Sequence, residues 1–251
     1  MSATRRHWLK RTLLLAGGTT AAAAAARVAD QYGLVPPDAR GMWAPGHTLN
    51  YASHRLLAGD APAREFTRDQ ISRPPHANGK PPGDPEYVRH REVAFADWRL
   101  RIEGMVERPG EFSVAELRTL PVRSQITQVA CEEGWSFIAE WTGVPLTALL
   151  ERVGMAAKAK YVVYHSIQPR WWDSIDMYDA LHPQTLVVYG MNGGTLPVGH
   201  GAPLRMRVPR QLGYKSVKYL TRLTLTDSLE GFGKGMGSFA AERGYAWYSG
   251  I

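Results

Sequence analysis

Alternation of apolar and polar side chains predicts strands in the middle of the chain. Residues 98–103 place three apolar side chains on one face and three charged ones on the other, as a half-buried strand does. Residues 160–167 contain an apolar, β-branched run that predicts a second strand. Residues 124–129 also predict a strand, although Ile126 and Val129 do not share one strict face.

Two short helices are predicted from their end signals. Ser113 and Glu116 form a capping box, which predicts a helix over 114–120. Pro145 and Gly154 would bound a second helix whose apolar residues recur at helical spacing. The pattern therefore places short helices among strands along this part of the chain.

Residues 29–90 lack a comparable pattern. They are rich in Pro, Gly, Arg and His, a composition typical of irregular coil. Coil of this length beside a compact domain is usually functional or disordered. We expect an arm that packs on a domain formed by residues 91–251. The apolar residues that would make this packing are Tyr51, Leu56, Leu57, Phe66 and Ile71.

Residues 1–28 have the pattern of a twin-arginine signal segment rather than a basic disordered tail. Arg5 and Arg6 precede an apolar, alanine-rich stretch with small residues suited to a signal peptidase. This route exports folded proteins to the periplasm, often with a cofactor already inserted, and an uncleaved leader would tether the protein. Cleavage after Ala26 would remove four basic residues and no acidic one, lowering the net charge from +7 to +3. Nucleic-acid binding then loses most of its compositional support.

The only cysteine, Cys131, lies where the strand over 124–129 would open into a loop. A lone cysteine is most often a small buried hydrophobe, and an exported one is at risk of oxidation unless buried or bound. Glu132 and Glu133 would raise the pKa of a free thiol, which disfavours a nucleophile, whereas a bound metal ion would hold the thiolate. No His follows within 30 residues, so blue-copper and zinc sites lack their usual spacing.

A long acid-free window favours an anionic ligand. No Asp or Glu lies between Asp179 and Asp227, a stretch that contains six Lys or Arg residues. Arg205 and Arg207 would share one strand face, and His200 lies between glycines that would let the backbone approach a ligand closely. The competing interpretations are a solvated strand face and a structural histidine. The six cations are Arg205, Arg207, Arg210, Lys215, Lys218 and Arg222.

Three motifs in order resemble the sulfite oxidase-like, molybdopterin-binding oxidoreductase family. Within it, the chain is similar to the bacterial twin-arginine-exported branch that includes the catalytic subunit of the periplasmic methionine sulfoxide reductase. The resemblance implies an α+β, strand-rich, sulfite oxidase-like fold. The motifs are Cys131-Glu132-Glu133-Gly134-Trp135 followed by Trp141-Thr142-Gly143-Val144-Pro145-Leu146, then His200-Gly201-Ala202-Pro203-Leu204-Arg205, then Gly213-Tyr214-Lys215-Ser216-Val217-Lys218.

The resemblance also implies a molybdenum–molybdopterin cofactor and assigns residues to it. Cys131 matches the cysteine whose thiolate binds molybdenum, and is the expected catalytic and metal-binding residue. Asn78 matches an arm residue that closes over the cofactor, and residues 216–218 match the segment that holds its phosphate, partly through backbone N–H groups. The expected cofactor-binding residues are Asn78, Cys131, Ser166, His200, Arg205, Ser216, Val217 and Lys218.

By the same resemblance, the chain would exchange an oxygen atom or electrons with a small-molecule or peptide substrate. Electrons would pass through a separate membrane haem b subunit or periplasmic cytochrome, since no haem-binding motif is visible. Glu132 and Glu133 stand where sulfite oxidases carry arginines, which disfavours sulfite. Reduction of methionine sulfoxide in periplasmic proteins is the alternative reaction, and a non-enzymatic anion-binding module is the alternative of another class. Nucleic acid is not expected as a partner.

Overall fold

The computed structural model describes residues 33–251, which belong to two compact units. The smaller unit, Met1–Gly59, contains helix α2 (Ala44–Ser53) in its described part. The larger unit, Asp60–Ile251, contains the strands of both sheets. The predicted signal segment lies outside the described residues, and the predicted start of the second domain at residue 91 stays a prediction.

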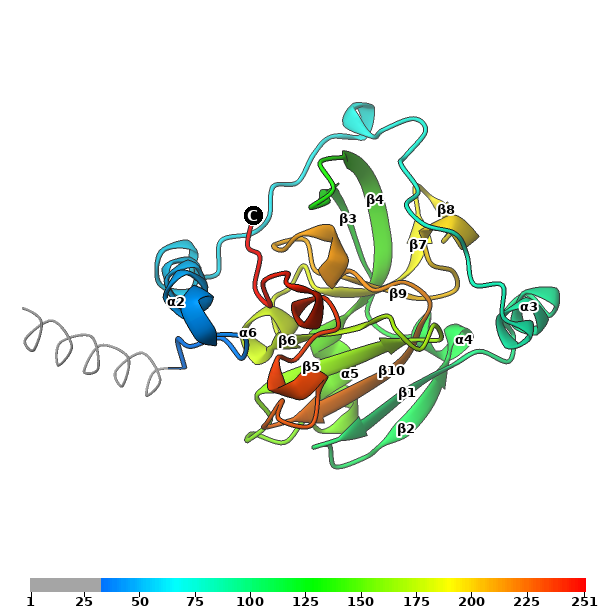
Figure 1. Ribbon diagram of the computed structural model, residues 1–251. Helices are drawn as coiled ribbons and strands as arrows, with labels where there is room; N and C mark the ends of the chain where they lie inside the picture. Colours follow the sequence, from blue (N-terminus) through cyan, green and yellow to red (C-terminus); the bar gives the residue numbers. More distant parts are fainter. Residues whose placement is uncertain (1–32) are drawn as a thin grey trace, which may run out of the picture. The chain divides into compact units, whose positions relative to one another are not determined.

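The first sheet has the strand order β2-β1-β10-β5-β6 (Figure 1). β1 and β10 are parallel, and the other neighbours are antiparallel. Leu100 and Ile102 are buried whereas Arg99 and Arg101 are exposed, which confirms the predicted alternation. The strands are β1 (Arg99–Gly104), β2 (Gly110–Ser113), β5 (Tyr161–Ser166), β6 (Trp172–Asp176) and β10 (Leu220–Thr226).

The second sheet places β3, β4, β7 and β8 in that order, with β9 paired to β7. β3 and β4 form a hairpin whose turn holds Cys131, and the Cys131 N–H donates to the Trp135 carbonyl at 2.9 Å. The predicted strand before the cysteine is confirmed, but its buried side chains are Gln125, Thr127 and Val129. The strands are β3 (Arg123–Ala130), β4 (Ser136–Pro145), β7 (Leu186–Met191), β8 (Gly194–Thr195) and β9 (Arg205–Arg207).

Both predicted helices are confirmed. The helices of the larger unit are α3 (Pro85–Glu92), α4 (Val114–Leu117), α5 (Leu146–Val153) and α6 (Met177–Ala180). α5 ends at Gly154, whose φ of +67° is the left-handed conformation that glycine adopts without a steric cost. α4 has the capping box of Ser113 and Glu116 but ends three residues before the predicted position. In the described part of the chain, no helix has the length and apolar character needed to cross a membrane.

Two hydrophobic cores support the sheets. The main core joins the first sheet to α5, and includes Leu100, Tyr164 and Leu149. The smaller core lies on the second sheet and includes Val129 and Trp141, which belong to the two strands of the hairpin that carries the cysteine. The expected α+β, strand-rich class is therefore confirmed, and the cysteine loop rests on a packed, rigid support.

The N-terminal arm contains more regular structure than its composition predicts. α2 and α3 are helices where irregular coil was expected. Each has a proline in its first turn, where the missing N–H removes no helical hydrogen bond. Leu56 and Leu57, which were expected to pack over the core, are exposed. Residues 60–84 are largely irregular, as predicted.

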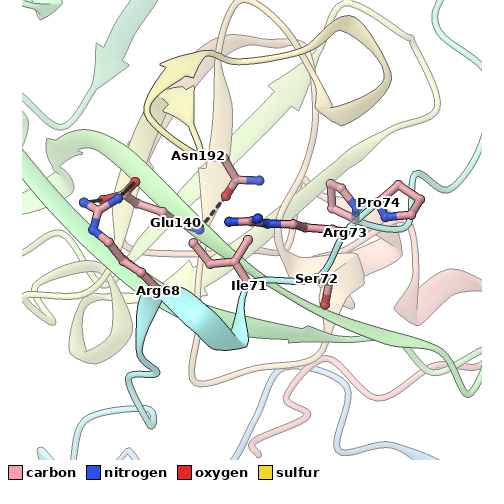
Figure 2. A pocket seen from close by; sticks show the side chains of 8 residues that line it. Arg68, Ile71, Ser72, Arg73, Pro74, Glu140 and Asn192 are labelled. Carbon is pink, nitrogen blue, oxygen red and sulfur yellow. Dashed lines mark hydrogen bonds and ion pairs between the residues drawn. The ribbon is translucent and has the colours of Figure 1, made fainter.

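The irregular part of the arm is fastened to the second sheet (Figure 2). Arg68 donates to both carboxylate oxygens of buried Glu140 at 2.6 and 3.2 Å. The Ser72 N–H donates to the Ile138 carbonyl at 2.9 Å, and Asn192 accepts a hydrogen bond from the Glu140 N–H at 2.9 Å. Arg68, Ser72, Glu140 and Asn192 border a hollow of about 340 Å³. The contacts fix the course of the arm along β4, before it reaches the cysteine loop.

Candidate functional site

A cavity of about 670 Å³ opens beside Cys131, within the size range of small-molecule sites. Ser166 does not line it, because its buried side chain turns back to accept a hydrogen bond from the Gln168 N–H at 3.1 Å. Gln168 itself lines the cavity, so Ser166 stands directly behind the wall. The other seven predicted site residues line the cavity: Asn78, Cys131, His200, Arg205, Ser216, Val217 and Lys218.

Cys131 is the first residue after β3 and is partly buried. The pKa of its thiol is raised to about 12, chiefly by burial, and a hydrogen bond from Sγ to Glu132 at 3.2 Å and the charges of Glu132 and Glu133 act in the same direction. The predicted effect of the two acids is confirmed in direction, although burial is the larger cause. A thiol held protonated at neutral pH is a poor nucleophile but can be deprotonated by a metal ion.

The acid after Glu132 has a structural role. Glu133 accepts hydrogen bonds from the Trp135 indole at 2.7 Å and from the Asn78 side chain at 3.0 Å. His76 packs on Trp135 with ring centroids 4.3 Å apart. These contacts attach the arm to the cysteine loop beside the cavity. Asn78 was expected, from the resemblance, to be the arm residue that closes over the cofactor.

Arg205 and Lys218, two of the five Lys or Arg residues that line the cavity, bond to neutral acceptors. Arg205 is buried and donates to the carbonyls of His200 at 2.9 Å and Ser216 at 3.1 Å. Lys218 donates to the carbonyls of Asn78 at 2.6 Å and Gly199 at 2.7 Å. A carbonyl satisfies a donor but does not neutralise its charge. Arg205 and Lys218 therefore contribute positive charge that an anionic ligand would balance, and Glu132, Glu133 and Asp173 line the same cavity.

Shifted pKa values agree with an excess of positive charge. The pKa of Lys218 is lowered to about 8, chiefly by burial and to a smaller extent by the charge of Arg205. Burial also lowers the pKa of His200 to about 4, with added contributions from Arg205 and Lys218, so the imidazole is neutral at pH 7. Burial lowers the pKa of Arg205 to about 10. An anion placed among these groups would favour their charged forms.

Pyrophosphate binding to the ligand-free protein is expected to weaken as the pH rises through about 8, where Lys218 loses its proton. Above that pKa binding must take up a proton, so each further pH unit costs up to about tenfold in affinity. Calorimetric titration with inorganic pyrophosphate would measure this effect. Lys218→Met should bind more weakly and lose the pH dependence. An affinity that stays constant above pH 8 in the unsubstituted protein would contradict the assignment.

The remaining four cations of the acid-free window do not line the cavity. Lys215 is fully buried and lies 2.6 Å from Asp173, and Arg210 lies 3.8 Å from Asp179. Arg207 is fully buried and bonds to Thr127 at 3.2 Å. The solvated-face interpretation of Arg205 and Arg207 is therefore wrong, since both are buried on one face over the Trp141 ring. Arg222 lies 3.8 Å from Glu103 on the first sheet.

The glycines next to the cavity serve the packing of the protein's own backbone. Gly201 has a φ of +108°, and a Cβ there would lie 2.8 Å from the Lys218 Cβ. It therefore lets the His200 segment lie against Lys218, where the sequence suggested close approach to a ligand. A Cβ at Gly213 would lie 3.2 Å from the Val129 side chain. Gly213 thus lets the segment before Ser216 pack on the strand that ends at the cysteine.

An aromatic rim borders the cavity and was missed in part by sequence reasoning. Trp171 and Trp172 line the cavity. Phe239, Arg243 and Tyr245 line it too, from the C-terminal segment. The Arg243 guanidinium lies 4.3 Å from the Phe239 ring centroid, and Trp171 remains 55% exposed. The only signal in the sequence was the concentration of aromatic residues near the C-terminus.

Among residues 33–251, no group of three or more His, Cys, Asp or Glu side chains is arranged to hold a metal ion. A metal at this site would have Cys131 as its protein ligand and would need further ligands from a bound group. That requirement suits a metal that enters as part of an organic cofactor, whose phosphate would lie among Arg205 and Lys218. The donor set thus fits the expected molybdenum–molybdopterin group.

Comparison with known proteins gives a family match over residues 87–231, described as "Oxidoreductase molybdopterin binding domain". The chain is 40% identical to a putative protein-methionine-sulfoxide reductase subunit, YedZ1, of Azospira oryzae, over 64% of this chain and 58% of that protein. It is 32% identical to the protein-methionine-sulfoxide reductase catalytic subunit MsrP of Xanthomonas campestris, over 55% of this chain and 48% of that protein. The chain thus spans about half the length of these relatives.

A solved structure also matches. The crystal structure of the sulfane dehydrogenase SoxCD from Paracoccus pantotrophus superimposes with a TM-score of 0.50 and 26% sequence identity. The match covers 54% of this chain and 40% of that one.

Proposed function

Because the chain belongs to the family of oxidoreductase molybdopterin binding domains, we propose that it is an exported molybdenum–molybdopterin oxidoreductase that transfers oxygen atoms or electrons. One observation carries the proposal. The sole cysteine lines the same cavity as Arg205 and Lys218, whose hydrogen bonds within the described chain all go to carbonyls. A soft-metal ligand and a phosphate site thus share one cavity.

Each part of the cavity would have a separate task. Cys131 would bind molybdenum as a thiolate, because coordination displaces the proton that burial otherwise holds on sulfur. Arg205, Lys218 and the neutral imidazole of His200 would hold and orient the pterin phosphate, with Ser216 and Val217 beside them. When bound, the cofactor supplies the redox chemistry and the oxygen-atom transfer, while the protein fixes its position and its access to substrate.

Access to the cysteine would be controlled by the rim and the arm. Trp171 and Tyr245 are 55% and 42% exposed at the cavity wall, where they would contact an incoming substrate. Asn78 and Glu133 close the opposite side through their hydrogen bond. Glu132 and Glu133 place negative charge beside the thiol, which favours a neutral substrate over an anion such as sulfite.

Methionine sulfoxide in exported proteins is the second candidate substrate. It is favoured by the names of the relatives and by its lack of charge, which suits a thiol flanked by two acids. The reaction takes up two electrons and two protons, converts the sulfoxide to the thioether and releases water. A haem partner, such as a membrane haem b subunit or a periplasmic cytochrome, would supply the electrons. Periplasmic location by the twin-arginine route belongs to the same proposal.

Metal analysis of protein purified from its exported form tests the proposal. About one molybdenum per chain, with pterin released on denaturation, is expected for a single-site cofactor protein. Absence of molybdenum, in a host shown to make the cofactor, would favour the competing class of a non-enzymatic anion-binding module. That module would show binding that weakens steeply with salt and no metal.

Substrate choice is tested on the same preparation. A reduced viologen dye serves as the electron donor, and two kinds of candidate substrate are compared. One is an oxidised, unfolded protein, and the other is a panel of small sulfoxides and N-oxides. Loss of one oxygen atom from oxidised methionine, followed by mass spectrometry, would support protein methionine sulfoxide. Turnover of the small compounds alone would support a small-molecule oxidoreductase.

A further inference from the structure

The most exposed large apolar side chains of the described chain are concentrated in one short segment. Five such residues have between 69% and 86% of their surface exposed, and all lie within residues 41–58. The next most exposed, Val122, reaches 61% and lies elsewhere. An exposed apolar cluster of this density normally marks an interaction surface. The five residues are Met42, Trp43, Leu49, Leu56 and Leu57.

The segment is continuously helical, which gives the exposed residues a common side. A 3₁₀ turn (Gly41–Trp43), α2 and a π-helical turn (His54–Ala58) follow one another without a break. Met42, Leu49 and Leu56 are each seven residues apart, which is close to two helical turns. They therefore form a stripe along one side, with Trp43 and Leu57 next to its ends.

The charge of the segment is of one sign. No Asp or Glu lies between Asp38 and Asp60, whereas Arg40 and Arg55 are near its two ends. A helix with one arginine near its end, another directly before it, a tryptophan and an apolar stripe is suited to the surface of an anionic lipid bilayer, where the apolar side enters among the headgroups. The segment has neither the length nor the uninterrupted apolar sequence needed to cross the bilayer.

We propose that residues 41–58 form an interfacial helix that holds the protein on the surface of an anionic phospholipid membrane. The occupant of the apolar stripe is the headgroup and acyl boundary of the bilayer. The positive charge supplies long-range attraction, and the five apolar side chains supply the affinity. This inference does not depend on the cofactor or on the reaction, because the segment belongs to the smaller unit and the cavity to the larger one.

Vesicle binding by the purified full-length protein tests the proposal. Co-sedimentation is expected with vesicles of phosphatidylethanolamine and phosphatidylglycerol, and less with phosphatidylcholine alone or at high salt. Leu49→Glu combined with Leu56→Glu should weaken partition at least ~10-fold, because the variant lacks two leucines that would become buried in the bilayer. Val122→Glu is the matched control, since it adds a charge at another exposed apolar site and should leave partition unchanged.

A second measurement follows one residue of the stripe. Adding anionic vesicles should shift tryptophan emission to shorter wavelength in the unsubstituted protein, and the shift should be reduced in Trp43→Phe. All variants keep the same N-terminal residues, so a contribution from residues 1–32 cancels in the comparison.

Three outcomes would overturn the proposal. The first is that the protein does not bind vesicles. The second is that the double variant and Val122→Glu lose vesicle binding equally. The third is that the double variant changes the oligomeric state of the protein in the absence of lipid. The last would assign the stripe to a second copy of the chain. Molybdenum content is measured on every variant, so failure of this proposal is separated from failure of the proposed function.

Discussion

Cys131→Ser is expected to reduce turnover by more than about 100-fold, because serine lacks the soft thiolate that molybdenum would bind. Changes to residues that merely support a metal ligand already cost about 10- to 100-fold, so loss of the ligand should cost more. Pterin content should remain largely intact, since the cations that would hold the phosphate are untouched. The measurements are steady-state turnover and pterin fluorescence after denaturation.

Ser166→Ala is the control for that experiment. Ser166 was predicted to bind the cofactor, but it lies behind the cavity wall and bonds to the Gln168 backbone. Its replacement should leave turnover within a few-fold of the unsubstituted protein. Full activity in Cys131→Ser would contradict the ligand assignment, and equal losses in both variants would point to general damage at the site.

Lys215→Met should destabilise the protein by about 3–5 kcal/mol at neutral pH, the largest stability effect we expect from a single substitution. Lys215 Nζ donates to Asp173 at 2.6 Å and to the Ser174 carbonyl at 3.0 Å, and both side chains of the ion pair are buried. Removing the lysine leaves a buried carboxylate without its counter-ion. Chemical denaturation would measure the loss.

The pH dependence of that loss has a definite sign. Burial raises the pKa of Asp173 to about 6 even with Lys215 in place, and removal of Lys215 would raise it further. A carboxyl whose folded pKa is raised favours folding at low pH and loses that contribution as the pH rises through the folded pKa. The deficit of Lys215→Met should therefore shrink as the pH falls toward 6 and be smallest below pH 6, where Asp173 is protonated in both folded proteins.

Two further variants test the same pair. The double variant Lys215→Met with Asp173→Asn should recover part of the stability at neutral pH, because the uncompensated charge is gone. Exposed Lys158→Met should change stability by no more than about 0.5 kcal/mol. Equal effects of Lys215→Met and Lys158→Met would show that the buried pair contributes nothing.

Local signals in the sequence were sufficient for much of the fold. The alternation that predicts β1 and the glycine that ends α5 both act through neighbouring residues, and both are confirmed. The sulfite oxidase-like, molybdopterin-binding fold, expected from three motifs, is confirmed by the family match and the structural neighbour. The same motifs contain residues that meet in one cavity, from Cys131 to Lys218, and the arm residue Asn78 lines it too.

Sequence reasoning was wrong where contacts join distant segments. The acid-free window with its six cations favoured an anionic ligand, but Lys215 pairs with Asp173 and Arg210 lies near Asp179, acids that precede the window. Counting charged residues within one window of the sequence misses acidic residues of other elements that lie close to the window in the fold. The proline-rich composition of the arm indicated coil, and this was wrong for α3. Proline is also favoured in the first turn of a helix, so composition alone does not separate the two cases.

Lys218 joins two processes that are far apart along the chain. Its ammonium group faces the cavity and also holds the carbonyl of Asn78, 140 residues away, on the arm. A ligand that draws this ammonium group toward itself competes with the arm for the same three protons. Loading of the cavity and anchoring of the arm are then thermodynamically linked, and each changes the free energy of the other by the same amount. Filling of the cavity and fixing of the arm therefore influence each other through the contacts of a single side chain, Lys218.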